Sequence, residues 1–272
     1  MTKLIDQHIH CCCSLDSTTP MADMVEAARD RGMAAVCFTD HVEMDDSVTG
    51  HLAPNFEQWL PEMLSTYEAL MASPPEGIQV RLGMELGAPN HFPEVARAAA
   101  ARTEFDFILG SLHNLRDVTD FYYYRYTTEA QCRRINEDYL TELLEIARMD
   151  CFDVMAHVAY TCRYMARAGF QTRITAENSR DELTELFRRL ISGGKGIEVN
   201  TSGLRQGGQA YPSMDILRLY RELGGEIVTV GSDGHVPRDA GALIPEGCEL
   251  LRAAGFRYVA EFVRRQTVFH AL

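Results

Sequence analysis

The feature that most constrains the fold is a short apolar run that recurs seven times along the 272 residues. Turn residues bound each run, and helical spacing of apolar residues follows most of them. Several runs, such as Phe-Asp-Phe-Ile-Leu-Gly, are apolar almost throughout, which is typical of parallel strands covered on both faces. The predicted strands are Lys3–His8, Ala34–His41, Gln79–Gly87, Asp106–His113, Phe152–His157, Gly196–Ser202 and Glu226–His235.

Helices are predicted between these strands, and the clearest covers 176–192. Thr175 is placed to cap its start, and Gly193-Gly194 to end it. One stripe of this helix carries Leu183, Leu186, Phe187, Leu190 and Ile191. The other predicted helices cover 21–31, 56–71, 92–102, 128–149, 214–223 and 256–270. This alternation predicts an α/β fold with a parallel sheet, either open or closed into a barrel.

The chain is predicted to form one domain over residues 1–272. Typical domains have about 100–200 residues, but barrels reach about 250 as one unit. No Pro/Ser/Gly-rich linker, charge block or low-complexity tract interrupts the sequence. A single large domain is therefore favoured over two.

Composition excludes some functions. Asp and Glu number 39 against 26 Lys and Arg, a formal net charge of −13, and no basic run is present. Nonspecific nucleic-acid binding needs a basic surface that neutralises phosphates, so neither a DNA-coating role nor binding to an anionic membrane is expected.

The expected location is the cytoplasm. The N-terminal residues reach charge too soon for a signal peptide, and no stretch of about 18 apolar residues occurs. None of the eight cysteines forms a CxxC pair, and Cys11, Cys12 and Cys13 are adjacent. We therefore expect free thiols in a reducing compartment. The three adjacent thiols also suggest sensitivity to oxidation or to thiophilic metals.

Histidines supply the main functional signal. Six of the nine fall at or just beyond the carboxyl end of a predicted strand, where barrel active sites are built. These are His8, His10, His41, His113, His157 and His235. The other three, His51, His91 and His270, have no such context and are expected at the surface.

Spacing points to metal binding. Because His8 and His10 are two apart on an extended segment, their rings face the same side and can hold one ion. Asp233-Gly-His235 repeats that spacing, while Asp16, Asp40 and Glu85 add carboxylates near other strand ends. Such a set is too large for one tetrahedral zinc, so it implies two or three divalent ions bridged by a carboxylate and water.

Several motifs in order resemble the polymerase and histidinol phosphatase (PHP) superfamily, specifically its stand-alone histidinol-phosphate phosphatases, over essentially the whole chain. The resemblance implies a distorted TIM-like (β/α)7 barrel. The motifs are Asp6-Gln-His8-Ile-His10, Ser14-Leu-Asp16, Thr39-Asp40-His41, Gly83-Met-Glu85, Gly110-Ser-Leu-His113, Met155-Ala-His157, Glu198-Val-Asn-Thr-Ser-Gly-Leu-Arg205 and Gly231-Ser-Asp233-Gly-His235.

The resemblance also implies three metal sites, occupied by Zn, Mn or Fe. The residues implied for the first ion are His8, His10, Glu85 and Asp233. The second would take Asp16, His41 and His235. The third would take His113 and His157, with Glu85 bridging it to the first. Asp40 is interpreted as a supporting group rather than a ligand.

Substrate contacts are implied at two arginines and a loop. Arg163 and Arg205, both expected on loops at the catalytic end, correspond to phosphate-binding arginines in the resembling enzymes, and a guanidinium fork matches phosphate oxygens. Asp117 or Asp120 would meet a cationic amine, and the aromatics within 121–126 would wall the pocket.

The expected function is metal-dependent hydrolysis of a small phosphate monoester, most specifically L-histidinol phosphate. Asp233, His235, Arg163 and Arg205 are the expected catalytic residues. Three alternatives stay open: a PHP phosphoesterase for another small phosphate or nucleotide, an amidohydrolase-like metallohydrolase, and a non-catalytic metal-stabilised module. No oligomeric state is predicted.

Overall fold

The computed structural model describes residues 2–46, 49, 51, 56–206 and 208–272. Within these residues the main sheet follows the order β1-β2-β4-β5-β6-β7-β8, with every neighbouring pair parallel. A short strand, β3, also pairs with β4. The strands are β1 (Ile5–Ile9), β2 (Ala35–Phe38), β3 (His41–Glu43), β4 (Gln79–Gly87), β5 (Phe107–Ser111), β6 (Val154–Met155), β7 (Gly196–Asn200) and β8 (Val228–Gly231).

The first and last strands of this order meet beyond the end of β8. The Asp233 backbone N–H donates to the His8 carbonyl at 2.7 Å, and the His10 N–H donates to the Gly234 carbonyl at 2.9 Å. These bonds bring the carboxyl ends of β1 and β8 together. The sheet is therefore a distorted TIM-like barrel with seven main strands, as predicted.

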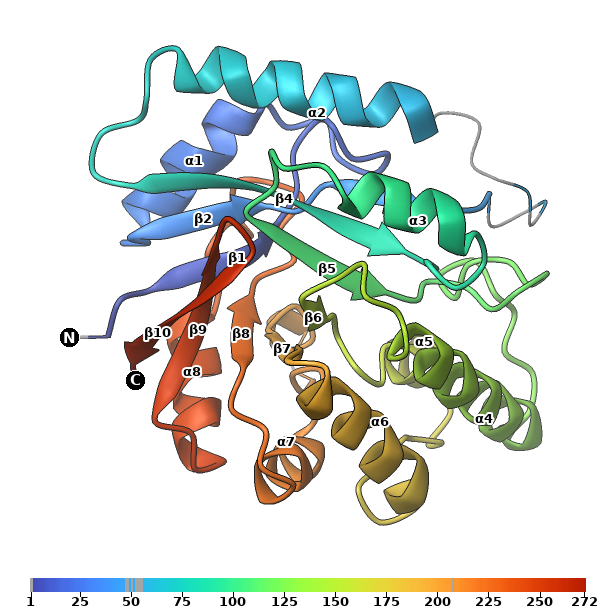
Figure 1. Ribbon diagram of the computed structural model, residues 1–272. Coiled ribbons are helices and arrows are strands. Elements are labelled where there is room, and N and C mark those ends of the chain that lie inside the picture. The colour runs from blue at the N-terminus through green and yellow to red at the C-terminus, as the bar shows by residue number, and fades with distance from the viewer. Residues whose placement is uncertain (1, 47–48, 50, 52–55, 207) are drawn as a thin grey trace.

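Helices surround the curved sheet (Figure 1). They are α1 (Met21–Asp30), α2 (Phe56–Met71), α3 (Pro93–Ala100), α4 (Glu129–Ile146), α5 (Thr161–Arg167), α6 (Arg180–Ser192), α7 (Met214–Glu222) and α8 (Ile244–Ala253), with a short 3-10 helix η1 (Leu204–Gln206). None of the helices in the described ranges combines the length and apolar character needed to cross a bilayer.

Helix α6 confirms the predicted apolar stripe but starts later than predicted. It buries Leu183, Leu186, Phe187 and Leu190, and Ile191 is half-buried. The helix begins at Arg180, because the residues before it form a separate turn: the Asn178 N–H donates to Thr175 Oγ1 at 3.1 Å. Thr175 therefore closes this turn and does not cap the helix.

The predicted helix over 256–270 is wrong. The segment is an antiparallel hairpin of β9 (Tyr258–Val263) and β10 (Gln266–Ala271). Arg264 and Arg265 form its two-residue turn with φ of 50° and 62°. Type I′ turns require positive φ at both central positions and usually carry Asn or Gly there, so two arginines gave no turn signal.

This hairpin closes the amino-terminal end of the barrel (Figure 1). Ala260 and Phe262 of β9 pack against inward-facing side chains, and the rings of Phe262 and Phe107 lie 4.9 Å apart. Glu261 binds Lys3 at 2.8 Å and Arg81 at 2.9 Å. Because the hairpin fills the amino-terminal end of the barrel, a functional site is expected at the carboxyl end.

Candidate metal centre

The six histidines at the strand ends converge in the structure, as their positions predict. His8, His10, His113 and His157 are buried, whereas His41 and His235 are partly exposed. The ring of His10 lies 4.0 Å from that of His235 and 4.5 Å from that of His41, measured between centroids. One compact imidazole cluster therefore fills the carboxyl end of the barrel.

One part of the cluster combines His8, His10, Glu85 and Asp233. The two Nε2 atoms of His8 and His10 lie 3.0 Å apart. Glu85 Oε2 is 3.2 Å from His8 Nε2 and 3.5 Å from His10 Nε2. Asp233 Oδ1 is 3.5 Å from His10 Nε2. The donor atoms of His8, His10 and Asp233 are thus close enough to hold one ion, and Glu85 Oε2 lies beside both histidines.

A second part lies nearer the solvent. Asp16 Oδ2 is 3.0 Å from His235 Nε2, and Asp16 Oδ1 is 3.7 Å from His41 Nε2. The ring nitrogens of His10, His41 and His235 come close enough to share an ion. Asp16, set by the loop after β1, thus reaches the same side of the cluster as His41 and His235.

The third part uses the other oxygen of Glu85. Glu85 Oε1 is 2.8 Å from His157 Nε2 and 3.1 Å from His113 Nε2, and those two nitrogens are 3.4 Å apart. Because Oε2 faces His8 and His10, the carboxylate presents one oxygen to each histidine pair. This is the arrangement of a bridging ligand.

These residues fit a group of divalent transition ions. The Nε2 atoms of His8 and His10 lie 3.0 Å apart, and those of His113 and His157 lie 3.4 Å apart. Each pair can make at most one N–H···N hydrogen bond. Buried His157 Nδ1 has no hydrogen-bond partner among the described residues. Imidazole and carboxylate donors suit zinc, manganese and iron.

Burial and neighbouring charges favour the ligand forms of His10 and Glu85, whereas nearby carboxylates outweigh burial and raise the pKa values of His8, His41 and His113, whose rings give up a proton when an ion binds. Burial, together with His235 and His41, lowers the pKa of His10 to about 3, so its ring is neutral. Burial alone would raise the pKa of Glu85, but His8, His113 and His41 hold it well below its usual range. Neutral imidazole and ionised carboxylate are the forms that coordinate a cation.

Two outer carboxylates orient the rings, and sequence reasoning did not assign them. Glu198 Oε1 lies 2.6 Å from His8 Nδ1, and Oε2 accepts the His157 N–H at 2.9 Å. Glu43 Oε1 lies 2.8 Å from His113 Nδ1 and 3.1 Å from His41 Nδ1. Glu43, two residues after His41 on β3, carried a spacing signal that could have found it.

Glycines make room for these carboxylates. A Cβ on Gly87 would overlap the Glu43 carboxylate, and one on Gly231 would overlap both Glu198 and His8. Strands β4 and β8 therefore need glycine at these two places, because any side chain would push an orienting carboxylate away from its histidine.

Asp40 supports the loop and lies outside the three ligand groups. Its carboxylate accepts the Cys11 N–H at 2.7 Å and the Ser14 hydroxyl at 2.8 Å. Ser14 Oγ in turn lies 2.9 Å from His10 Nδ1. The interpretation of Asp40 as a supporting group agrees with these contacts.

Both predicted arginines reach Asp233, but from helices rather than loops. Arg163 lies in α5, where Nη2 contacts Ser202 Oγ and is 3.5 Å from Asp233 Oδ2. Arg205 lies in η1 and donates from Nη2 to the Asp233 carbonyl at 3.1 Å. The expected loop placement is therefore wrong, because chain turns just before each arginine start new helices.

The two aspartates proposed for the substrate amine differ in position. Asp120 is partly buried and burial raises its pKa, partly offset by nearby His113. Asp117 is exposed, and no contact described for this part of the chain links it to the histidines. Of the aromatics in 121–126, Phe121 is buried, whereas Tyr122 and Tyr123 are exposed.

Of the histidines expected at the surface, His51 is exposed and His270 is partly buried. The expectation is wrong for His91, which is buried with Nδ1 2.6 Å from Asp45 and Nε2 2.6 Å from Glu142. These two carboxylates lie far from His91 in sequence, so its context could not show them.

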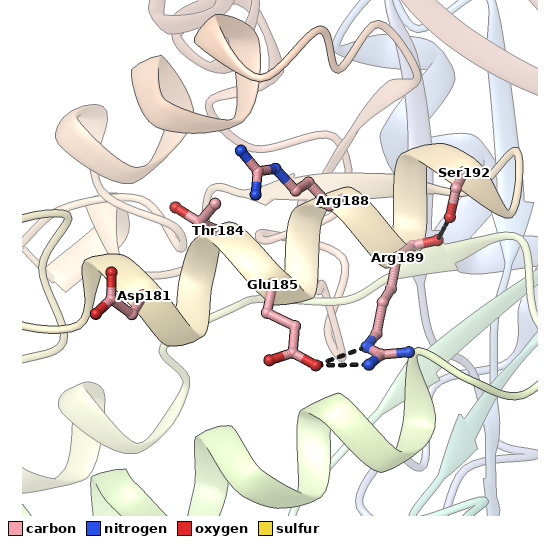
Figure 2. Close-up of a pocket in the computed structure, with 6 residues that line it drawn as sticks. All are labelled: Asp181, Thr184, Glu185, Arg188, Arg189 and Ser192. Carbon is pink, nitrogen blue, oxygen red and sulfur yellow. Dashed lines mark hydrogen bonds and ion pairs between the residues drawn. The ribbon is translucent and has the colours of Figure 1, made fainter.

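A separate shallow hollow lies along the outside of α6 (Figure 2). It is lined by Asp181, Thr184, Glu185, Arg188, Arg189 and Ser192. Its main internal contact is the exposed ion pair between Glu185 and Arg189 at 2.6 Å. No residue of the histidine cluster lines it, so we assign it no part in the chemistry.

Comparison with known proteins identifies the family of the chain. Residues 6–202 match the model of the PHP domain. The chain is 28% identical to the histidinol-phosphatase of Lactococcus lactis, covering 96% of this chain and 94% of the relative. A Thermotoga maritima protein named "Probable histidinol-phosphatase" is also 28% identical, with 94% and 95% covered.

Among solved structures, the chain resembles the L. lactis histidinol phosphate phosphatase complexed with zinc, L-histidinol and phosphate. The TM-score is 0.80 at 25% identity, and the match covers 98% of this chain and 99% of the other. The fold, the order of the histidine motifs and the family match lead to one assignment. The chain belongs to the PHP domain family.

Proposed function

We propose that the protein hydrolyses L-histidinol phosphate to L-histidinol and phosphate, as a metal-dependent phosphomonoesterase. The observation that carries this proposal is the placement of Glu85 between two histidine pairs, with Arg163 and Arg205 both beside Asp233. The zinc, L-histidinol and phosphate in the L. lactis neighbour support the substrate. The cytoplasm suits this role, because its reducing conditions keep the eight cysteines free.

Three divalent ions, Zn, Mn or Fe, are proposed to bind the three groups of donors. The first group is His8, His10, Glu85 and Asp233; the second is Asp16, His41 and His235; the third is His113, His157 and Glu85. When bound, such ions lower the pKa of a coordinated water, to about 7 for zinc, and offset the charge of the phosphoryl oxygens.

The chain's own residues bind and orient the substrate. Arg163 and Arg205 hold the phosphate, because each guanidinium can donate two parallel hydrogen bonds to its oxygens. Arg163 is held in place by the rings of Tyr160 and Tyr211, at 5.0 and 5.2 Å from its Cζ. A proton for the leaving oxygen is proposed to come from water rather than from Asp233, because burial alone would raise the pKa of Asp233 but His10 and His8 hold it well below its usual range. His235 with Asp16 keeps the outer side of the site in place.

The amine and imidazole of the substrate are proposed to meet the loop after β5. Asp120 is better placed than Asp117, because it is partly buried and lies near His113. Burial raises the pKa of Asp120, and His113 partly offsets this rise. The aromatic residues of 121–126 would form the wall. An acidic and aromatic loop for the cationic amine, together with two arginines for the dianionic phosphate, matches the charges of this substrate.

The test compares substrates on the same purified, metal-loaded protein. We expect kcat/KM for histidinol phosphate to exceed that for p-nitrophenyl phosphate by at least about 100-fold, which corresponds to about 2.7 kcal/mol of transition-state binding. Equal efficiencies, or a preference for a nucleotide, would remove the histidinol assignment and leave a phosphatase. Absence of turnover on every phosphate ester would overturn the proposal as a whole.

A further inference from the structure

Three thiols meet on the turn that follows β1. Cys11, Cys12 and Cys13 place their sulfurs within 4.8 Å of one another. Consecutive side chains of an extended strand point to opposite faces, but here the chain turns: the Ser14 N–H donates to the Cys11 carbonyl at 3.0 Å. The turn brings the middle sulfur to the same side as its neighbours.

The spacing suits a single ion bound by three sulfurs. Sulfurs about 2.3 Å from one ion lie at most about 4.0 Å apart in a trigonal site, so shifts of under about 1 Å complete the geometry. Cys11 and Cys13 are buried, whereas Cys12 is exposed and provides access from solvent. The other five cysteines are buried and are separated along the chain.

We infer that Cys11, Cys12 and Cys13 form a binding site for a soft thiophilic ion of the trivalent arsenic class, distinct from the histidine centre. Thiolate sulfur prefers such soft ions over the harder ions that imidazole and carboxylate hold. With arsenite the step balances: As(OH)3 reacts with three S–H groups, three As–S bonds replace three As–O bonds, and three waters leave. No oxidant or reductant is needed.

Hydrogen bonds through Asp40 connect the three cysteines to the histidine centre, so an ion bound by the cysteines is expected to affect that centre. The Cys11 thiol donates to Asp40 Oδ2 at 3.1 Å, and Asp40 Oδ1 accepts from Ser14, which contacts His10 Nδ1. An As–S bond removes the Cys11 donor and moves its sulfur. We therefore expect bound arsenic to reduce phosphatase turnover at least about 10-fold; this second effect rests on the proposed function, whereas binding does not.

The experiment uses the metal-loaded protein and two probes. Arsenite can bind three thiols, whereas phenylarsine oxide can bind only two because its third position is an As–C bond. After removal of free arsenite, elemental analysis is expected to find one arsenic per chain, and X-ray absorption three sulfur neighbours. Cys12→Ser, a change at an exposed side chain, is expected to weaken arsenite at least about 10-fold while phenylarsine oxide still binds Cys11 and Cys13. Cys248→Ala, at a distant buried thiol, is the control and is expected to bind like the wild type.

The outcomes separate the two parts of the inference. Wild type that retains no arsenic, or Cys12→Ser that binds arsenite as well as wild type does, would overturn the thiol site. Stoichiometric binding with unchanged turnover of histidinol phosphate would overturn the connection through Asp40. A protein that binds arsenic by three sulfurs but hydrolyses no phosphate ester would support the thiol site and contradict the proposed function, so the two failures are distinguishable.

Discussion

Glu198 holds His8 by the ring nitrogen that faces away from the other ligands: Oε1 lies 2.6 Å from Nδ1. When His8 keeps its ring proton on Nδ1 for this contact, Nε2, which lies 3.2 Å from Glu85, is left free to coordinate an ion. A carboxylate outside the donor set thereby selects which tautomer the histidine presents.

Replacing this carboxylate is expected to weaken metal binding. In Glu198→Gln the new amide has only one oxygen, so it cannot accept from both His8 and the His157 N–H. We expect metal affinity to fall about 10- to 100-fold, measured by competition with a chelator. Glu185→Gln, which removes an exposed carboxylate on α6, is the control. Unchanged affinity in Glu198→Gln would show that His8 needs no outer partner.

The proposed bridging role of Glu85 predicts a joint loss. More than one transition ion per chain is expected by elemental analysis, and a chelator is expected to abolish activity until Zn, Mn or Fe is returned. Glu85→Gln should reduce both ion content and turnover, because one substitution affects two histidine pairs. Active protein that contains no metal would contradict the whole scheme.

Arg205 is expected to matter for phosphate and not for metal. Arg205→Ala should keep its full metal content while kcat/KM falls about 100-fold, the usual scale for one lost donor to a charged transition state. Arg238→Ala is a matched control, because Arg238 lies on the neighbouring segment with its side chain 86% exposed. Wild-type kcat/KM in Arg205→Ala would refute the phosphate assignment.

His91 is expected to make stability depend on pH. Burial alone would lower its pKa, but hydrogen bonds to Asp45 and Glu142 raise it to about 9. Because this folded value exceeds the unfolded value of about 6.5, the stabilisation is complete below about pH 6.5 and is lost as the pH rises through 9.

The measurement compares free energies of unfolding of wild type and His91→Gln. We expect the difference between them to shrink by up to about 3 kcal/mol between pH 6 and pH 9.5. His51→Gln, at an exposed histidine, should show no such change. A difference between wild type and His91→Gln that is the same at both pH values would exclude a charged His91 in the folded protein.

The sequence predicted the strands well because their apolar runs are local signals. It failed where the signal was absent or misleading. The turn of the β9–β10 hairpin uses Arg264-Arg265 instead of Asn or Gly, so the segment was interpreted as a helix. Helix α8 was not predicted, because Pro245 and Gly247 near its start interrupt the helical pattern.

The residues of the candidate centre also fall into those that the sequence could predict and those that it could not. Histidines at strand ends could be found because parallel strands bring their carboxyl ends together. The roles of Glu43 and Glu198, and the burial of His91, depend on which side chains face one another across the barrel. Glu198 lies 190 residues from its partner His8, so no local pattern could pair them.

The first and last strands of the main sheet can meet only late in the synthesis of the chain. Asp6 accepts the Ser232 N–H at 2.8 Å across 226 residues, and the Asp233 N–H donates to the His8 carbonyl. His8 and His10 are made early, yet Asp233 and His235 reach them only when translation has passed residue 235. The nascent chain therefore exposes isolated histidines that hold ions weakly, and complete loading with metal waits until residue 235 has left the ribosome.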